Sequence, residues 1–420
     1  MEFAPILLAT LFYVVAGRWI ITRVSVESPL RVVAFLGLNL AIIAYLHCWL
    51  PRSLDFSASF ALKVLGVYVG FVSLQWFFVT RWARAKNWRS WIPVVAPLIF
   101  LIAVKYVPPQ INPALRLLAS TIGPEESVIH GALWLGVSYM AFRLSYSSLE
   151  LRRKSIETPT LLEFLCFAFF MPTLSVGPIS SYERFQVSIR QPDPSAFPIL
   201  RASHRILWGA TKFTLLASWV HPLTFSTLLA DGHLHGLFDL AVACCAYTIY
   251  LYLNFSGFCD IAVGLAALVG ISVQENFNAP LSAANIQEFW NRWHITLGQY
   301  ARDILFTPLS KTLLYRVKPQ RAPYVIAVTS IIVFVIIGIW HGVGWNFALF
   351  GLMHGLGLAV YHLWSHHWKR RLGKRYRQWQ QRPLPRLSAQ LLTFCFVSAS
   401  FAFFAMDLEQ LRWVLGNLTS

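Results

Sequence analysis

The sequence has few charged residues, and this scarcity excludes a soluble globular domain. Only 13% of its 420 residues are Asp, Glu, Lys or Arg, whereas 56% are hydrophobic and 15% aromatic. A soluble chain carries about 25% charged residues. The composition therefore predicts a polytopic membrane protein.

The cysteines of the sequence lack the spacing of metal ligands. No CxxC spacing occurs among the cysteines, which stand at positions 48, 166, 244, 245, 259 and 395. We therefore expect no disulfide, no structural zinc and no metal in the site. The first residues lack the basic start and cleavage site of a secretory signal, so residues 4–15 are expected to belong to the first span.

Apolar stretches long enough to cross a bilayer recur along the chain, since a helix needs roughly 17–25 such residues. An open sheet edge cannot lie in lipid, which excludes strands. We predict an all-α polytopic membrane protein with about ten to twelve transmembrane and re-entrant helices. The expected spans are 4–22, 32–50, 58–80, 91–107, 128–147, 206–221, 238–270, 323–340, 346–364 and 389–406.

No repeat, low-complexity tract or soluble domain divides the chain. We expect one integral-membrane domain over residues 1–420. Its parts are N-terminal helices in 1–127, a catalytic core in 128–364, and a basic cytoplasmic loop and last helix in 365–420.

The net charge of +17 reflects topology rather than nucleic-acid binding. Six stretches that alternate with the spans hold 29 of the 35 Lys and Arg: 18–31, 81–89, 143–154, 184–205, 292–321 and 369–386. By the positive-inside rule these basic loops are cytoplasmic. The opposite loops, 51–57, 108–127 and 222–237, should face the outside. Residues 369–386 also suit an anchor at anionic membrane lipid.

Two segments are predicted to enter the membrane region without crossing it. In 164–179, Pro172, Gly177 and Pro178 break the helix, and broken backbone at membrane depth must be buried in protein or line a cavity. The stretch 280–310 mixes charged and aromatic residues, as an amphipathic interfacial helix does.

Histidines inside apolar sequence are the main functional candidates, because an ionisable group in hydrocarbon is costly. His341 ends a span and is followed by Gly342 and Gly344, which let another group approach closely. A neutral imidazole there suits a general base for an alcohol. The alternative is a core histidine bonded to a neighbouring helix.

His294 lies in the amphipathic stretch. On one continuous helix it would share a face with Asn291 and Gly298, next to an aromatic face. The alternative is a histidine wetted by head groups. His354 is expected to be a packing residue of the next span, and Asp260 to pair with a basic residue from another helix. His362, His366 and His367 favour an interfacial belt over a zinc site.

One candidate histidine belongs to a cytoplasm-facing segment and the other to the external end of a span. A cavity joining them would cross the membrane. This geometry suits group transfer from a cytoplasmic donor to an outer acceptor, and it equally suits a transporter.

Four stretches of the sequence resemble the membrane-bound O-acyltransferase (MBOAT) family, in particular its branch of bacterial alginate O-acetylation proteins and teichoic-acid D-alanyl transferases. They occur in family order: LGVSYMAFRLSYSSLE (135–150), FFMPTLSVGPISSYERF (169–185), the block from Asn254 to Leu309, and GIWHGVGWNFALFGLMHG (338–355).

The resemblance implies a helical fold around a tunnel, with His341 in the WHG motif and His294 in the RWHITL motif as catalytic residues. His341 would be the general base, and His294 or a nearby donor would steady the thioester oxygen. Residues expected to support the reaction are Asn291, Arg302, Asp303, Asp260, His354 and Trp340. The donor would be an acyl-CoA or acyl-carrier-protein thioester, with no permanently bound cofactor.

We therefore expect a multi-pass enzyme of the bacterial cytoplasmic membrane that moves a short acyl group, acetyl first, to a hydroxyl of an extracytoplasmic envelope polysaccharide. D-alanyl transfer to teichoic acid is the second possibility, followed by acylation of a lipid, peptide or small secreted molecule. An acyl carrier protein or a periplasmic acyltransferase is the expected partner. A transporter, flippase or recruiting scaffold is the non-enzymatic alternative.

Overall fold

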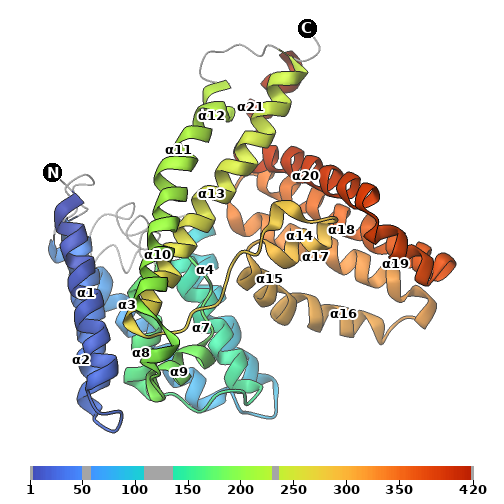
Figure 1. The fold of residues 1–420 in the computed structure, drawn as a ribbon. Coiled ribbons are helices and arrows are strands. Elements are labelled where there is room, and N and C mark those ends of the chain that lie inside the picture. Colours follow the sequence, from blue (N-terminus) through green and yellow to red (C-terminus); the bar gives the residue numbers. More distant parts are fainter. Residues whose placement is uncertain (1–2, 50–57, 108–135, 229–235, 418–420) are drawn as a thin grey trace. The chain divides into compact units, whose positions relative to one another are not determined.

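The structure is a computed structural model that describes residues 3–49, 58–107, 136–228 and 236–417 (Figure 1). Helices account for all the regular structure in these residues, and they contain no strand. The prediction of an all-α fold is confirmed. The expected outer loops 51–57 and 108–127, and residues 229–235 of the loop 222–237, lie outside the described residues.

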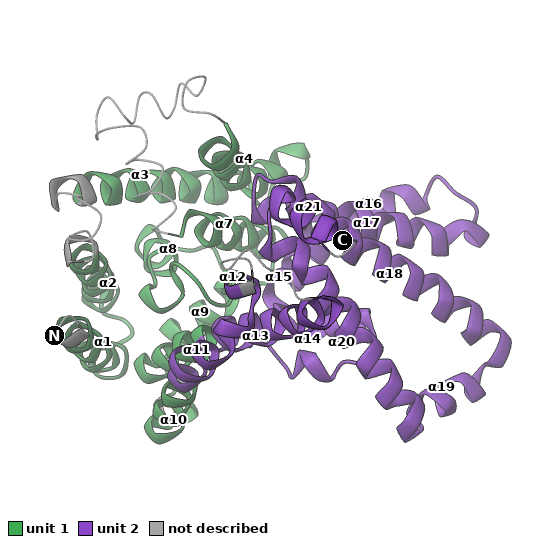
Figure 2. Ribbon diagram, turned by 90° about the horizontal axis from the view of Figure 1, so that it is seen from above, with its two compact units in different colours: residues 1–208, 258–274 green, residues 209–257, 275–420 purple. Residues whose placement is uncertain are grey.

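The chain forms two compact units, coloured separately in Figure 2. Unit 1 comprises residues 1–208 and 258–274, and unit 2 comprises residues 209–257 and 275–420. The helices α10 (Ile199–Ala210) and α13 (Leu237–Val269) each contribute to both units.

The remaining helices divide between the units as follows. Unit 1 contains α1 (Phe3–Arg23), α2 (Pro29–Trp49), α3 (Ala58–Trp82), α4 (Ile92–Tyr106), α7 (Val137–Arg152), α8 (Leu161–Ala168) and α9 (Tyr182–Arg190). Unit 2 contains α11 (Ala217–Val220), α12 (Phe225–Leu228), α14 (Ile286–Arg292), α15 (Ile295–Ala301), α16 (Thr307–Leu314), α17 (Ala322–His341), α18 (Trp345–Leu372), α19 (Lys374–Gln381), α20 (Pro383–Ala405) and α21 (Leu408–Asn417).

Eight helical stretches of the described chain are long and apolar enough to cross a membrane. They are Pro5–Arg23, Pro29–Leu46, Leu62–Trp82, Trp88–Tyr106, Leu237–Val269, Pro319–His341, Trp345–Leu372 and Pro383–Ala405. They coincide with eight of the ten expected spans, and the prediction of a multi-pass membrane protein is confirmed.

The other two expected spans differ from a simple crossing helix. The first, 128–147, begins outside the described residues and continues into α7. The second, 206–221, runs from α10 through a π-helical segment, Thr211–Leu216, into α11. It carries the buried Lys212, whose Nζ donates a hydrogen bond to Ser256 Oγ at 3.2 Å. This stretch is not among the eight candidate spans of the described chain.

The basic stretch 143–154 is mostly the helix α7 and not a loop, so this part of the charge pattern was wrong. Arg143 is fully buried and donates hydrogen bonds to the backbone oxygens of Phe167 and Thr173. A guanidinium that satisfies carbonyls inside the protein has a structural role and carries no topological signal.

The predicted break in 164–179 is confirmed. The helix α8 begins with a capping box between Thr160 and Glu163 and ends before Phe169. A 3-10 turn around Pro172 follows, and the phenylalanines of this segment are buried. The broken backbone is thus covered by protein. Backbone groups without helical partners could not face lipid, because lipid offers them no hydrogen bond. Its position relative to the membrane stays a prediction.

Glycines allow α17 and α18 to pack closely in unit 2. A Cβ on Gly351 would lie 2.2 Å from the Phe334 carbonyl oxygen, and one on Gly338 would lie 2.2 Å from the Phe347 carbonyl oxygen. Gly342, in the turn between the helices, leaves room for the Phe347 ring, which would be 2.0 Å from an added Cβ. The two helices therefore meet through backbone contacts that only glycine permits, and the Phe347 ring leaves no room for a side chain at position 342.

We expect Gly351→Ala to destabilise the protein, because backbone at 2.2 Å has to move to admit a methyl group. Overpacking of this kind costs about 1–3 kcal/mol. Gly70→Ala in α3 is the matched control, since nothing lies within 4 Å of its added Cβ. Thermal unfolding in detergent should show a lower midpoint for Gly351→Ala only. Equal midpoints would contradict the close packing of α17 on α18.

Candidate functional site

His294 occupies a break between two short helices. The helix α14 ends at Arg292 and α15 begins at Ile295, while His294 itself adopts left-handed backbone angles, φ 44° and ψ 52°. The expectation of one continuous amphipathic helix was therefore wrong. Positive φ in a residue other than glycine is uncommon and costs free energy, so the surrounding contacts must hold this conformation.

Hydrogen bonds to the loop around Asn276 keep α14 and α15 from joining into one helix. The backbone N–H of Ile295 donates to the Asn276 carbonyl at 2.9 Å, and the N–H of Asn278 donates to the Arg292 carbonyl at 2.9 Å. These two bonds pin the residues on either side of His294 to a second segment. Continuation of the α14 helix through His294 would break them.

The side chain of Asn276 fixes the tautomer of His294. Its Oδ1 accepts from the Thr296 backbone N–H at 3.3 Å and from Thr296 Oγ1 at 2.8 Å. A backbone N–H can only donate, so the atom facing it is the amide oxygen. His294 Nδ1 lies 3.1 Å from the same oxygen and must therefore carry the proton. The neutral ring is left with its lone pair on Nε2.

His294 is neutral over the physiological pH range. It is 4% exposed, and burial, together with the charge that His341 can carry, lowers its pKa to about 3. Removing an imidazolium from water costs free energy, and a like charge nearby adds to that cost. The electrostatic effect also means that the two imidazoles lie within interaction range in unit 2.

His341 is the last residue of α17 and is half-buried. Its ring lies between aromatic neighbours, with centroid distances of 4.4 Å to Trp340 and 5.0 Å to Phe404. Phe255 makes a similar edge contact with His294 at 4.8 Å. Aromatic walls reduce the water around the two imidazoles, which strengthens electrostatic interactions between them.

His354 has a complete set of hydrogen bonds in the core of unit 2. Trp290 Nε1–H donates to His354 Nδ1 at 3.3 Å. Ser400 Oγ lies 3.0 Å from His354 Nε2, and its own proton goes to the Val397 carbonyl at 2.8 Å. His354 Nε2 must therefore donate to Ser400. The ring is neutral and fully buried, as the sequence predicted for a packing residue.

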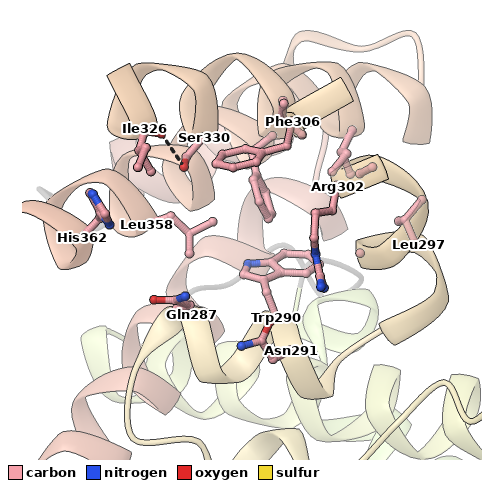
Figure 3. Close-up of a pocket in the computed structure, with 15 residues that line it drawn as sticks. Gln287, Trp290, Asn291, Leu297, Arg302, Phe306, Ile326, Ser330, Leu358 and His362 are labelled. Carbon is pink, nitrogen blue, oxygen red and sulfur yellow. Dashed lines mark hydrogen bonds between the residues drawn. The ribbon is translucent and has the colours of Figure 1, made fainter. Parts of the chain in front are cut away.

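A cavity of about 460 Å³ adjoins the two helices that flank His294. Trp290 on α14 and Leu297 and Gly298 on α15 form part of its wall. Figure 3 shows Trp290, Arg302 and Leu358 entering the cavity from three different helical segments. Its polar residues are Gln287, Asn291, Arg302, Ser330 and His362. Such a cavity has the size and the mixed lining of a small-molecule site.

The predicted supporting residues fall into different surroundings. Asn291 and Arg302 line the cavity, and Trp340 packs on His341. Asp303 stands beside Arg302 in a π-helical segment, Arg302–Phe306. Asp260 accepts from Arg205 Nε at 3.0 Å and from Nη2 at 2.9 Å within unit 1. The expected ion pair of Asp260 is thus present.

No three His, Cys, Asp or Glu side chains gather as metal ligands in the parts of the chain that the structure describes. His362 faces the cavity, while His367 on the same helix is exposed and packs on Trp368 with centroids 5.6 Å apart. His362 thus places an imidazole in the wall of the cavity.

Sequence reasoning missed four residues of this site: Asn276, Thr296, Trp290 as a hydrogen-bond donor, and Ser400. Asn276 stands in an irregular stretch 18 residues before His294, and no periodic pattern marks it. Thr296 stands in the RWHITL motif, two residues after His294 in the sequence. This closeness along the chain was the one available signal that it belongs to the site. Ser400 comes from α20, which only the tertiary structure brings to His354.

Comparison with known proteins gives a family match over most of the chain. The model of the MBOAT, membrane-bound O-acyltransferase family, matches residues 114–402. This range contains His294, His341 and the cavity.

Curated relatives are similar at moderate identity. A teichoic acid D-alanyltransferase of Streptococcus thermophilus is 28% identical over 348 residues, covering 80% of either chain. A peptidoglycan O-acetyltransferase of Helicobacter pylori is 31% identical over 61% of this chain. The match covers 46% of that protein, so this chain spans about half of its length. A probable alginate O-acetylase of Azotobacter vinelandii is 27% identical, covering 74% of this chain and 62% of the relative.

Proposed function

The chain belongs to the membrane-bound O-acyltransferase family, and from that membership we propose that His341 and His294 carry acyl transfer from a thioester to a hydroxyl. The expectation of an O-acyltransferase is confirmed by the family match and by the named activities of the relatives. The observation that supports these two residues is that each imidazole lies against aromatic side chains of unit 2, Phe255 beside His294 and Phe404 beside His341.

In the proposed reaction His341 accepts the proton of the acceptor hydroxyl as its oxygen attacks the thioester carbon. The C–O bond forms, the C–S bond breaks, and the protonated imidazole returns the proton to the leaving sulfur. The products are an ester and a thiol, so no other reactant is needed. General base catalysis of this kind typically raises the rate 10²–10⁴-fold. Holding both reactants in place raises it further.

For His294 we propose a role different from the oxyanion donor that the family resemblance implied. Its Nδ1–H is committed to Asn276, so the neutral ring presents an acceptor at Nε2. Because a charge on His341 opposes a charge on His294, His294 stays an acceptor while His341 is protonated. It would accept a hydrogen bond from a second donor group on the substrates, because the reacting hydroxyl has one proton and gives it to His341, and another group would stabilise the thioester oxygen.

We propose that the cavity receives the arm of the thioester donor. The arm carried by coenzyme A and by acyl carrier proteins is a neutral chain with two amides, ending in a phosphate. Gln287, Asn291 and Ser330 offer neutral hydrogen-bonding groups, and Arg302 offers the charge that pairs with a phosphate. The donor would arrive as a substrate, with no cofactor permanently bound.

The proposed acceptor is an extracytoplasmic hydroxyl of an envelope polysaccharide, and the proposed acyl group is acetyl. Two of the relatives named above are O-acetylating proteins of alginate and peptidoglycan. D-alanyl transfer is the second candidate, favoured by the 80% coverage in both directions with a teichoic acid D-alanyltransferase. A lipid, peptide or small-molecule acceptor ranks below these two.

We propose a bacterial cytoplasmic-membrane location with the basic loops inside. The positive-inside rule supports this orientation, and the basic stretch 369–386 would lie against anionic lipid. An acyl carrier protein would deliver the thioester from that side, or a periplasmic acyltransferase would collect the acyl group on the other.

The function is tested by measuring envelope acyl esters in a deletion strain that carries wild-type protein, His341→Ala or His294→Asn at matched levels. Asparagine is chosen at position 294 because it tolerates the positive φ there. Mild base releases the esters, and mass spectrometry identifies the acid. We expect the wild-type gene alone to restore an ester, as acetate for the first candidate or as D-alanine for the second.

Each other result has a definite meaning. Full restoration by both variants would exclude catalysis by these histidines and favour a transporter or a recruiting scaffold. No change of any ester between deletion and complemented strains would refute acyl transfer to the envelope.

A further inference from the structure

The hydrogen bonds of His354 form a directed chain from one helix to another. Val397 O accepts from Ser400, Ser400 accepts from His354 Nε2–H, and His354 Nδ1 accepts from Trp290 Nε1–H. Trp290 Nε1, His354 Nε2 and Ser400 Oγ each donate one proton to the next acceptor. Only one arrangement of protons therefore satisfies all the bonds of the chain. The chain begins on α20, passes through α18 and ends on α14.

Trp290, at the end of this chain, is a wall residue of the cavity. Its ring packs edge to face on the rings of Phe334 and His354, with centroid distances of 4.7 Å and 5.1 Å. Aromatic contacts alone permit several ring orientations, whereas the N–H bond to a fully buried histidine selects one. Figure 3 shows the indole beside Asn291 and Arg302, which are polar groups of the same cavity.

We propose that His354 is a positioning residue of the acyltransferase, acting through Trp290: its neutral ring holds the indole in the orientation that shapes the cavity for the thioester donor. This inference rests on the proposed function of the cavity. His354 touches no substrate in this role, and it takes no part in proton transfer, because both of its nitrogens are occupied. Loss of the chain would loosen donor binding without removing a reacting group.

The test measures binding of a donor analogue to the full-length protein in nanodiscs. The probe is the 2-oxopropyl thioether of 4′-phosphopantetheine, in which a methylene separates the carbonyl carbon from sulfur, so no acyl transfer can occur. We expect Trp290→Phe, Ser400→Ala and His354→Leu each to raise the dissociation constant about tenfold, as an unsatisfied buried polar group or a lost wall contact does.

Two further variants separate positioning from packing. His354→Gln offers both an acceptor and a donor and should recover most of the affinity lost in His354→Leu. Thr393→Val on α20 is the control, because its hydroxyl bonds only within its own helix to the Ala389 carbonyl. It should bind as the wild type does. The double variant Trp290→Phe/His354→Leu should bind no more weakly than either single variant, since both break one chain.

Three results would overturn the inference: unchanged affinity in Trp290→Phe and Ser400→Ala, additive losses in the double variant, or no recovery with glutamine. A purely structural role would lower the unfolding midpoint of His354→Leu and leave the affinity of its folded fraction unchanged. Absence of binding to the wild type would refute the donor cavity itself. Binding that follows the expected series in a protein without ester transfer would refute the proposed function and leave the positioning role of His354 standing.

Discussion

Replacing His341 with alanine is expected to lower the rate of acyl transfer by roughly 10²–10⁴-fold, the range that general base catalysis supplies. The imidazole is half-buried among aromatic rings at the end of α17. Turnover of a radiolabelled acetyl thioester by purified protein, with the acceptor identified from the ester analysis, measures the loss directly.

Two further variants test whether the loss in His341→Ala comes from proton transfer. His341→Gln keeps a polar side chain of similar size but cannot take a proton, so an equal loss in this variant assigns the effect to proton transfer. His367→Ala on α18 is the matched control, because that ring is exposed and stands outside the proposed site. If glutamine restored turnover, the role of His341 would be hydrogen bonding and not base catalysis.

The fold was predictable from the sequence where one physical signal dominates. Long apolar stretches predicted ten spans, because hydrocarbon accepts only helices of that length, and eight of them coincide with candidate spans of the described chain. Pro172 predicted the break after α8, since proline removes a backbone donor. The prediction for 143–154 failed because charge alone does not distinguish a basic loop from a helix that buries Arg143 against carbonyl oxygens.

The site was predictable only in part. The sequence marked His294, His341 and the pairing of Asp260, since each is a costly ionisable group in apolar surroundings. It did not reveal the break at His294, because no proline or glycine stands there and the positive φ is held by the loop at Asn276. Contacts between segments far apart in the chain decide such details, and a single sequence carries no pattern for them.

Asn276→Ala is expected to reduce acyl transfer by roughly 10²-fold, although Asn276 reaches no substrate. Without the amide oxygen, His294 can move its proton to Nε2 and lose the acceptor that faces the reaction. A catalytic histidine held in the wrong tautomer loses up to ~10⁴-fold in the serine-protease triad. The same change leaves the Thr296 N–H and hydroxyl without their acceptor, so a lower unfolding midpoint is also expected and has to be measured beside the rate.

Asn276→Asp separates the tautomer effect from the structural one, because a carboxylate oxygen accepts the same three hydrogen bonds. It should retain most of the activity near neutral pH. The negative charge favours the imidazolium, so it raises the pKa of His294 from about 3. Activity depends on the neutral ring and falls as pH drops through that pKa, so the acid limb of the pH–rate profile should move to higher pH in Asn276→Asp. An unmoved limb with equal losses in both variants would mean that Asn276 supports the fold alone and that His294 does not act as an acceptor.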